Sequence, residues 1–202
     1  MTAVKLRKSE RTRRYIIEKS APIFNKKGYS GTSLQDLMDA TGLTKGGIYG
    51  NFENKHEIAA AAFEYNSRYI LDQVKASVLK QTTAKGKMLA ITEFYRNYIY
   101  QPALSGGCPL LNTAVEADDM HPELKEKVLR SLDYIRRSFI YIINEGIELG
   151  EFKSGLEPDR YATIFLSLIE GGIMQMKIYK KSKYLIDSLV HMEEIIKKEL
   201  SV

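Results

Sequence analysis

Residues 32–55 constrain the fold of this chain more than any other stretch. Residues 33–40 predict a short helix, because apolar side chains recur there at helical spacing and Thr32 or Ser33 is suited to cap its first turn. A tight turn follows at residues 41–43, and the next segment contains three glycines: Gly46, Gly47 and Gly50. A glycine inside a helix costs about 1 kcal/mol relative to alanine. A helix, a turn and a short glycine-rich helix predict a helix-turn-helix whose bare backbone suits close approach to DNA in a major groove.

The two helices of this motif predict which side chains face DNA. Ile48 and Phe52 should pack beneath the second helix. The residues then directed outward are Thr44, Lys45, Gly46, Gly47, Tyr49 and Asn51. We expect Thr32 and Ser33 to lie near phosphate, because a helix N-terminus offers free N–H groups and the positive end of the helix dipole. Plain capping of the helix is the alternative role for these two residues, and the two roles are compatible.

Over about fifty residues the chain resembles the TetR family of transcriptional repressors. The matching positions are residues 13–24, 28–29, 32–34, 40–43, 45–46, 48–49, 52 and 54–55. The resemblance implies that Lys45 and Gly47 lie near base edges, whereas Tyr49 and Lys55 hold the DNA backbone. This chain departs from the family at Gly50 and Asn51, where members often carry histidine. Asn51 is suited either to read an adenine or to touch phosphate.

Charge is distributed unevenly along the 202 residues. Residues 1–55 hold 11 Lys and Arg against 5 Asp and Glu, a net charge of +6, whereas residues 56–202 hold 19 against 20. The positive field therefore coincides with the groove-binding motif. A basic patch is often only a solvated face, but this coincidence favours nucleic acid as the partner.

Composition excludes several classes of protein. An apolar content of 44% allows a sizeable core, and the longest apolar run, residues 161–176, is too short to span a bilayer and contains Glu170. No secretory signal is readable, and the single cysteine excludes an internal disulfide, which fits a reducing cytoplasm. Three scattered histidines give no zinc-ligand cluster. We therefore expect a cytoplasmic protein without metal or cofactor.

Helical patterning continues to the end of the chain and predicts an all-α fold with two domains. We place the helix-turn-helix domain at residues 1–55 and a helical effector-binding and dimerisation domain at residues 56–202. In the first helix, residues 9–27, Pro22 predicts a kink or a locally loosened turn. Arg11, Arg13 and Arg14 on this helix are expected to be solvated charges rather than base readers, and Gly28 is expected to end the helix.

The two domains are joined by a long helix in this prediction. Asn54 and Glu57 resemble a capping box, in which each side chain accepts a hydrogen bond from the other residue's backbone. That box opens a helix that runs towards Lys80, and no linker rich in Pro, Gly or Ser interrupts it.

The second domain carries helical patterns at residues 84–100, from Cys108 onward, and from His121 to about residue 149. Aromatic side chains at helical spacing are more often core residues than ligand contacts, but the density of tyrosines here is high. We expect an effector pocket lined by Tyr95, Tyr98, Cys108, Leu111, Val115, Tyr134, Tyr141 and Phe165. Their apolar and phenolic character suits a hydrophobic small molecule.

Cys108 has two interpretations that the sequence leaves open. It is either a small buried apolar residue, or a reactive thiol favoured by the N-terminus of the helix that follows it. Some TetR-family regulators with a similar Gly-Cys segment use that cysteine to sense electrophiles or oxidants. With no second cysteine, any switch at Cys108 requires an adduct or a bond between subunits.

The last two helices predict a dimer. Residues 158–179 are apolar on more than one side, which indicates burial on two fronts, and residues 184–200 offer a further apolar face. The resemblance implies a homodimer formed through these two helices as a four-helix bundle. The predicted function is a homodimeric repressor that binds an inverted-repeat operator in double-stranded DNA and is released by a hydrophobic or reactive effector. The alternatives are a non-specific architectural DNA binder and a small all-helical enzyme, for which no phosphate loop or nucleophile-base pair is visible.

Overall fold

The computed structural model describes residues 7–98, 106–117 and 121–202. The helices are α1 (Lys8–Gly31), α2 (Leu34–Thr41), α3 (Lys45–Tyr49), α4 (Lys55–Val78), α5 (Ala84–Tyr98), α6 (Pro109–Ala117), α7 (Pro122–Glu148), α8 (Pro158–Tyr179) and α9 (Lys183–Glu194), followed by a π-helical turn (Ile195–Leu200). In these residues no strand forms beyond one isolated bridge between Phe152 and Ser201. The all-α prediction is confirmed. No helix in the described ranges is long and apolar enough to cross a bilayer.

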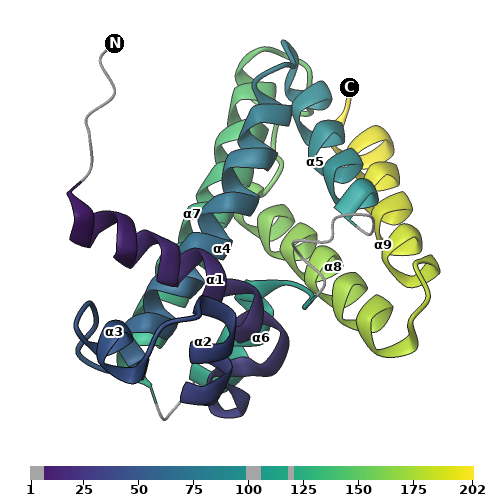
Figure 1. The fold of residues 1–202 in the computed structure, drawn as a ribbon. Coiled ribbons are helices and arrows are strands. Elements are labelled where there is room, and N and C mark those ends of the chain that lie inside the picture. The colour runs from purple at the N-terminus through teal and green to yellow at the C-terminus, as the bar shows by residue number, and fades with distance from the viewer. Residues whose placement is uncertain (1–6, 99–105, 118–120) are drawn as a thin grey trace. The chain divides into compact units, whose positions relative to one another are not determined.

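The chain divides into two compact units. The first unit comprises residues 1–68 and 109–128, and the second comprises residues 69–108 and 129–202. The divisions therefore fall inside α4, inside α7 and at the peptide bond between Cys108 and Pro109. The first unit contains α1, α2, α3, α6 and the first part of α4 (Figure 1). The functional division at residues 55 and 56 stays a prediction. Two further predictions, a basic arm at residues 1–8 and a loop at residues 102–107, fall largely outside the described residues, which lack 1–6 and 99–105.

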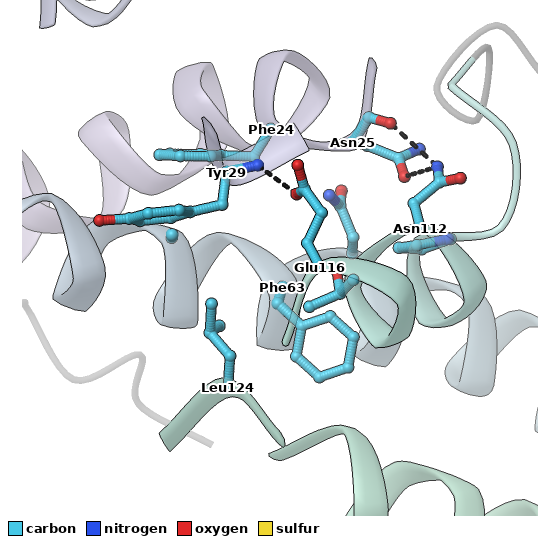
Figure 2. Close-up of a pocket in the computed structure, with 11 residues that line it drawn as sticks. Phe24, Asn25, Tyr29, Phe63, Asn112, Glu116 and Leu124 are labelled. Carbon is cyan, nitrogen blue, oxygen red and sulfur yellow. Dashed lines mark hydrogen bonds between the residues drawn. The ribbon is translucent and has the colours of Figure 1, made fainter. Parts of the chain in front are cut away.

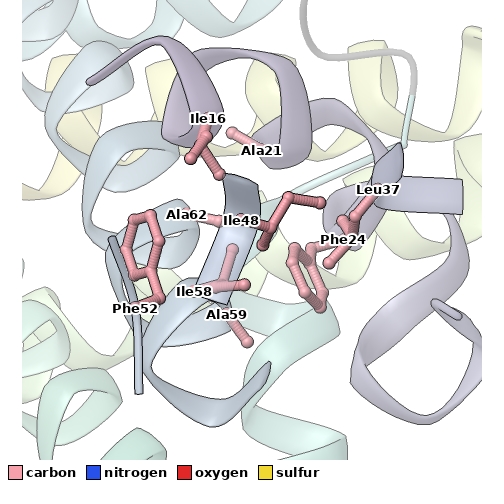
Figure 3. Packing of buried hydrophobic residues seen from close by; sticks show 9 residues of the cluster. All are labelled: Ile16, Ala21, Phe24, Leu37, Ile48, Phe52, Ile58, Ala59 and Ala62. Atoms are coloured by element: carbon pink, nitrogen blue, oxygen red, sulfur yellow. The ribbon is translucent and has the colours of Figure 1, made fainter. Parts of the chain in front are cut away.

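A hydrophobic core holds the first unit together (Figure 3). Its buried members come from all of the N-terminal helices: Ile16, Ala21, Phe24, Leu37, Ile48, Phe52, Ile58, Ala59 and Ala62. Burying one such large apolar side chain contributes about 1.5–3 kcal/mol. Ile48 is fully buried and Phe52 is 2% exposed, which confirms that both residues pack beneath α3.

Side-chain caps determine where the short helices begin. Ser33 Oγ accepts a hydrogen bond from the Asp36 N–H at 3.1 Å, and the Asp36 carboxylate accepts one from the Ser33 N–H at 2.9 Å. Thr44 Oγ1 caps α3 by accepting from the Gly47 N–H at 3.2 Å. These bonds satisfy backbone donors that a helix N-terminus otherwise leaves unpaired.

The cap of α4 differs in one arm from the predicted capping box. Asn54 Oδ1 accepts from the Glu57 N–H at 2.9 Å, as predicted. The Glu57 carboxylate, however, accepts from the Glu53 N–H at 2.8 Å instead of from Asn54. The helix therefore still begins where the pattern indicated.

The kink predicted at Pro22 is wrong, whereas the alternative, a locally loosened turn there, stays a prediction. The backbone of α1 departs from helical dihedrals at Gly28, with φ of 74° and ψ of 177°, and at no other described position of this helix. A proline removes one hydrogen bond, but the rest of the helix tolerates that loss here. The break lies at Gly28 because only glycine adopts this backbone conformation readily.

In the second unit α8 and α9 pack side by side (Figure 1). A Cβ atom at Gly172 would lie 3.0 Å from the Leu185 side chain, so this glycine permits the close approach of α8 to α9. A Cβ at Gly171 would meet nothing within 4 Å. The two neighbouring glycines therefore face different surroundings.

The predicted helix at residues 184–200 begins as α9 but ends with a different hydrogen-bond pattern. Its last turn, Ile195–Leu200, is π-helical, and the Ser201 N–H donates to the Ile196 carbonyl at 3.1 Å. The Lys153 N–H also donates to the Leu200 carbonyl at 2.8 Å. Pairing with the segment around Phe152 accompanies this wider last turn, and apolar periodicity cannot reveal such pairing.

Candidate DNA interface and effector site

The recognition helix α3 presents an exposed, nearly bare face. Thr44, Lys45 and Gly46 are exposed, while Gly47 and Tyr49 are half-buried. A Cβ at Gly46 would approach only Thr44 Oγ1, at 4.0 Å. Packing within this unit therefore does not require a glycine at position 46, whereas a Cβ at Gly50 would lie 3.0 Å from the Gly46 carbonyl oxygen.

Arg13 fixes the end of the recognition helix. Its guanidinium donates to the Asn51 carbonyl at 2.6 Å and to the Glu57 carboxylate at 2.6 Å, and it lies 4.0 Å from the centroid of the Phe52 ring. Arg13 is therefore not simply a solvated charge: its side chain remains 39% exposed but is paired within the unit. Its side chain ties α1 to the turn after α3 and to the first turn of α4.

Thr32 and Asn51 use their side chains within the protein. Thr32 is 1% exposed, and its hydroxyl donates to the Gly28 carbonyl at 2.6 Å. Asn51 Nδ2 donates to the Gly47 carbonyl at 2.9 Å and so supports the end of α3. The structure thus favours a structural role for both side chains, whereas the exposed Ser33 lies at the start of α2.

Lys55 lies on an aromatic cluster that the sequence did not predict. Its Nζ is 4.4 Å from the centroid of the Tyr29 ring. Tyr29 stacks on His56 with ring centroids 4.7 Å apart, and its hydroxyl is 2.9 Å from His56 Nε2. His121 also lies against Tyr29, with centroids 4.4 Å apart. Burial raises the pKa of Tyr29 above its usual value.

Helix α6 is bonded to the end of α1 (Figure 2). The Tyr29 N–H donates to a Glu116 carboxylate oxygen at 2.5 Å, and Asn112 Nδ2 donates to the carbonyl and the side-chain oxygen of Asn25 at 3.0 Å each. The cavity between these residues has a volume of about 20 Å³, which suffices for one water molecule. This space is too small for an organic effector.

Asp36 at the start of α2 is held as a carboxylate. A hydrogen bond from Lys27 at 2.6 Å and the two hydrogen bonds from Ser33 lower the pKa of Asp36 to about 2. Lys27, which lies near the helix-turn-helix, therefore pairs with an acid of the same unit. It contributes less to the local positive field than its formal charge indicates.

The eight predicted effector residues fall into two groups. Tyr95, Tyr98, Cys108 and Phe165 are buried in the second unit. The other four are half-buried or exposed and comprise Leu111, Val115, Tyr134 and Tyr141. Val115 is 75% exposed, Tyr134 50% and Tyr141 67%, so these three do not line an enclosed cavity within the described chain. Both tyrosines lie on the outward side of α7, whose buried face is formed by other positions.

Cys108 contacts a residue that the sequence analysis did not select. Its Sγ lies 3.1 Å from Oε1 of Glu170, in the middle of α8, and the thiol is the donor. Burial raises the pKa of Glu170 to about 7, and the hydrogen bond from Cys108 opposes that rise. Near them the Tyr98 hydroxyl donates to the Gly107 carbonyl at 3.3 Å.

A separate groove of about 580 Å³ lies on the second unit, between α4 and α5. It is lined by Gln73, Ser77, Lys80, Gln81, Gly86, Leu89, Ala90, Glu93, Phe94 and Asn97. None of the predicted effector residues lines this groove. Because its lining combines apolar and polar side chains, this groove is a second candidate site for a ligand.

Family models match both parts of the chain. Residues 16–62 match the model of bacterial regulatory proteins of the tetR family, and residues 84–192 match a tetracyclin repressor-like C-terminal domain. The chain belongs to the TetR family. As a member it is a DNA-binding transcriptional regulator, and the resemblance inferred from the helix-turn-helix residues is confirmed.

Solved structures and curated relatives agree with this assignment. A TetR-family regulator from Cytophaga hutchinsonii is 39% identical, with a TM-score of 0.91 over 98% of this chain and 99% of the other. A second, from Chloroflexus aurantiacus, is 34% identical, with a TM-score of 0.93 over 98% and 100%. The HTH-type transcriptional repressor DhaR of Mycobacterium sp. (strain GP1) is 29% identical over 82% of each chain.

In this TetR-family protein, sequence reasoning missed Arg13, Tyr29, Glu116 and Glu170. Of these, Glu170 had a visible signal, because it is the acid within the apolar run at residues 161–176. The hydrogen bonds of Glu116 and Arg13 join residues 87 and 38 positions apart. A local sequence pattern cannot reveal contacts between residues that lie so far apart in the chain.

Proposed function

We propose that this TetR-family regulator is a homodimeric repressor that reads an inverted-repeat operator with α3. The observation that carries the proposal is the exposed face of α3, where glycines leave the backbone open above a fixed core. Lys45 and Tyr49 flank that backbone, and Ser33 and Lys55 complete the proposed contact surface. The recognition helices of a dimer must stand about 34–36 Å apart, or a multiple of this distance, to enter successive major grooves.

Charge supports sequence-specific binding over general DNA packaging. The net charge of +6 is confined to residues 1–55, whereas the rest of the chain is close to neutral. An architectural binder that only neutralises phosphate does not require a large helical unit with its own core. We likewise set aside the enzyme alternative, because the family is one of transcriptional regulators. We propose that the regulator acts in the cytoplasm, where a bacterial chromosome lies.

Dimerisation is proposed to occur through α8 and α9. On these helices Met174 is 48% exposed, Ile178 71% and Val190 44%. The open position at Gly171 allows a second backbone to approach closely. Apolar side chains exposed on two adjacent helices favour burial against a second copy.

The proposed switch is a shift between two populations of the dimer. An effector that binds near Tyr95, Tyr98 and Phe165 in the second unit changes DNA binding only through its different affinity for the two states. Cys108 in the same region extends the proposed effector class to electrophiles. The state favoured by the effector has a recognition-helix spacing that no longer matches the operator.

Selection of duplexes from a random pool by the purified protein tests the DNA-binding proposal. We expect enrichment of an inverted repeat with half-sites about one helical turn apart. The Lys45→Ala variant should then bind the selected duplex more weakly than Lys26→Ala, which removes the same charge from α1. Binding without enrichment that vanishes as salt rises would instead indicate non-specific association.

Sedimentation of two variants tests the proposed dimer helices. Ile178→Lys places a charge on the exposed face of α8 and should yield monomers at micromolar concentration. Leu149→Lys, at a position 64% exposed in the same unit, is the control and should remain dimeric. A dimeric Ile178→Lys protein would exclude this face as the interface.

A further inference from the structure

The contact between Cys108 and Glu170 contains two groups that the DNA-binding function does not use. The thiol donates to Oε1 at 3.1 Å, and the other oxygen, Oε2, is buried without a hydrogen-bond partner. An unpaired buried carboxyl oxygen is costly, so it requires an explanation. Cys108 is the only cysteine of the chain, and it is 6% exposed.

We propose that Glu170 is the proton acceptor that makes Cys108 a nucleophile toward an electrophilic effector, such as a small α,β-unsaturated carbonyl compound. The inference rests on the proposed regulation by an effector and names the chemistry of that site. It gives the only acid of the run at residues 161–176 a role that packing alone does not supply.

The proposed reaction is an addition that needs no oxidant or reductant. Oε1 of Glu170 takes the thiol proton while Sγ of Cys108 forms a bond to the β-carbon of the acceptor. The π electrons of the double bond move to give an enolate, and the Glu170 carboxylic acid returns the proton to the α-carbon. The products are a thioether on Cys108 and an ionised Glu170, so atoms and charges balance.

The surroundings of the pair suit a proton transfer near neutral pH. Burial raises the pKa of Glu170 to about 7, so both its accepting and its donating forms are populated under physiological conditions. Tyr95 and Tyr98 on α5 stay neutral, because burial raises the pKa of each phenol. Lys177 lies about two turns after Glu170 on α8, and its side chain packs against Gly107.

Gly107 permits the backbone conformation that places Cys108 beside Glu170. Its φ of 87° lies in the region that favours glycine. A Cβ at this position would lie 2.9 Å from the Lys177 side chain. A larger residue would therefore shift the backbone that carries Cys108 and change its distance to Glu170.

If the contact between Cys108 and Glu170 is purely structural, removing the charge of Glu170 should change the reaction rate of Cys108 in the opposite direction. If Glu170 is only a neighbouring negative group, it disfavours the thiolate by like-charge repulsion. Glu170→Gln would then raise the thiolate fraction and make Cys108 react faster. If Glu170 accepts the proton, the same substitution makes Cys108 react more slowly, so the sign of the change decides between the two roles.

The test measures adduct formation on the full-length protein without DNA. Wild type, Glu170→Gln, Glu170→Asp, Cys108→Ser and the surface control Glu148→Gln are mixed with excess methyl vinyl ketone between pH 5.5 and 9, and intact mass is followed with time. Circular dichroism checks that each variant is folded.

For wild type we expect a single adduct whose rate rises with a midpoint near pH 7. Glu170→Gln should react at least tenfold more slowly at pH 7 and lose that midpoint, whereas Glu170→Asp should keep the midpoint at a lower rate. Glu148→Gln should match wild type, and Cys108→Ser should form no adduct. A folded Glu170→Gln protein that reacts as fast as wild type, or faster, overturns the proposal, as does a wild type that does not react.

The readout separates this proposal from the proposed repressor function. Adduct formation does not depend on an operator, so failure to find a specific DNA sequence leaves the rates unchanged. Slow reaction of Glu170→Gln supports the proton transfer whether or not the adduct later releases DNA.

Discussion

Replacing Gly46 with alanine separates the needs of the fold from the needs of DNA recognition. Gly46 lies in the first turn of α3, its φ is not positive, and an added Cβ would approach only Thr44 Oγ1 at 4.0 Å. The folded protein therefore accepts the methyl group. Since alanine loses less conformational entropy than glycine in a helix, the variant should be more stable by about 0.5–1 kcal/mol.

The magnitude is measurable by thermal unfolding. For a chain of this size 1 kcal/mol shifts the melting temperature by about 2–4 °C, so Gly46→Ala should melt about 1–4 °C higher than wild type. Operator affinity should move in the other direction. A methyl group on the face proposed to approach DNA should weaken binding about tenfold or more, which corresponds to at least about 1.4 kcal/mol.

Gly31→Ala is the matched control, because Gly31 lies in the same unit but outside α3. A Cβ at Gly31 would make an ordinary contact with Lys27 Cβ at 3.6 Å. It should leave operator affinity unchanged. A Gly46→Ala protein that is more stable and binds the operator as tightly as wild type would refute the reasoning. The glycine would then serve neither folding nor close approach to DNA.

Three further substitutions test the supports of the interface. Gly28→Ala should lower the free energy of unfolding by about 1–3 kcal/mol in urea denaturation, because the backbone there has φ of 74° and a Cβ would lie 2.4 Å from a Glu116 oxygen. Arg13→Ala should cost about 1–2 kcal/mol in the same assay, and a loss below about 0.5 kcal/mol would show that its bonds to Asn51 and Glu57 are not structural. Asp36→Asn should flatten the dependence of the melting temperature on pH between about 4 and 2: the folded pKa of about 2 lies below the usual 3.8, so the carboxylate stabilises above pH 4 and that stability is lost as pH falls.

The sequence predicts the local parts of this fold well, because they depend on short-range chemistry. The helix-turn-helix has its apolar spacing, its cap at Ser33 and its turn at Gly42 within a few residues of one another. Each of these signals involves side chains and backbone groups one or two turns apart.

The parts that could not be predicted depend on contacts between distant segments. The short helix predicted from Cys108 onward falls in the predicted effector domain, yet α6 belongs to the same compact unit as α1. The exposed positions of Tyr134 and Tyr141 depend on which face of α7 is covered. A local pattern shows that a helix has an apolar stripe, but it does not show how wide the covered area is.

Helix α6 also bears on how hybrid regulators of this type should be assembled. A chimera that exchanges residues 1–55 alone would set Asn112 and Glu116 against a foreign α1 and break the bonds to Asn25 and Tyr29. Exchange of residues 1–68 together with 109–128 keeps those partners in one parent. The compact unit that carries α3 is therefore discontinuous in sequence, so we expect a functional hybrid only when both of its segments come from the same parent.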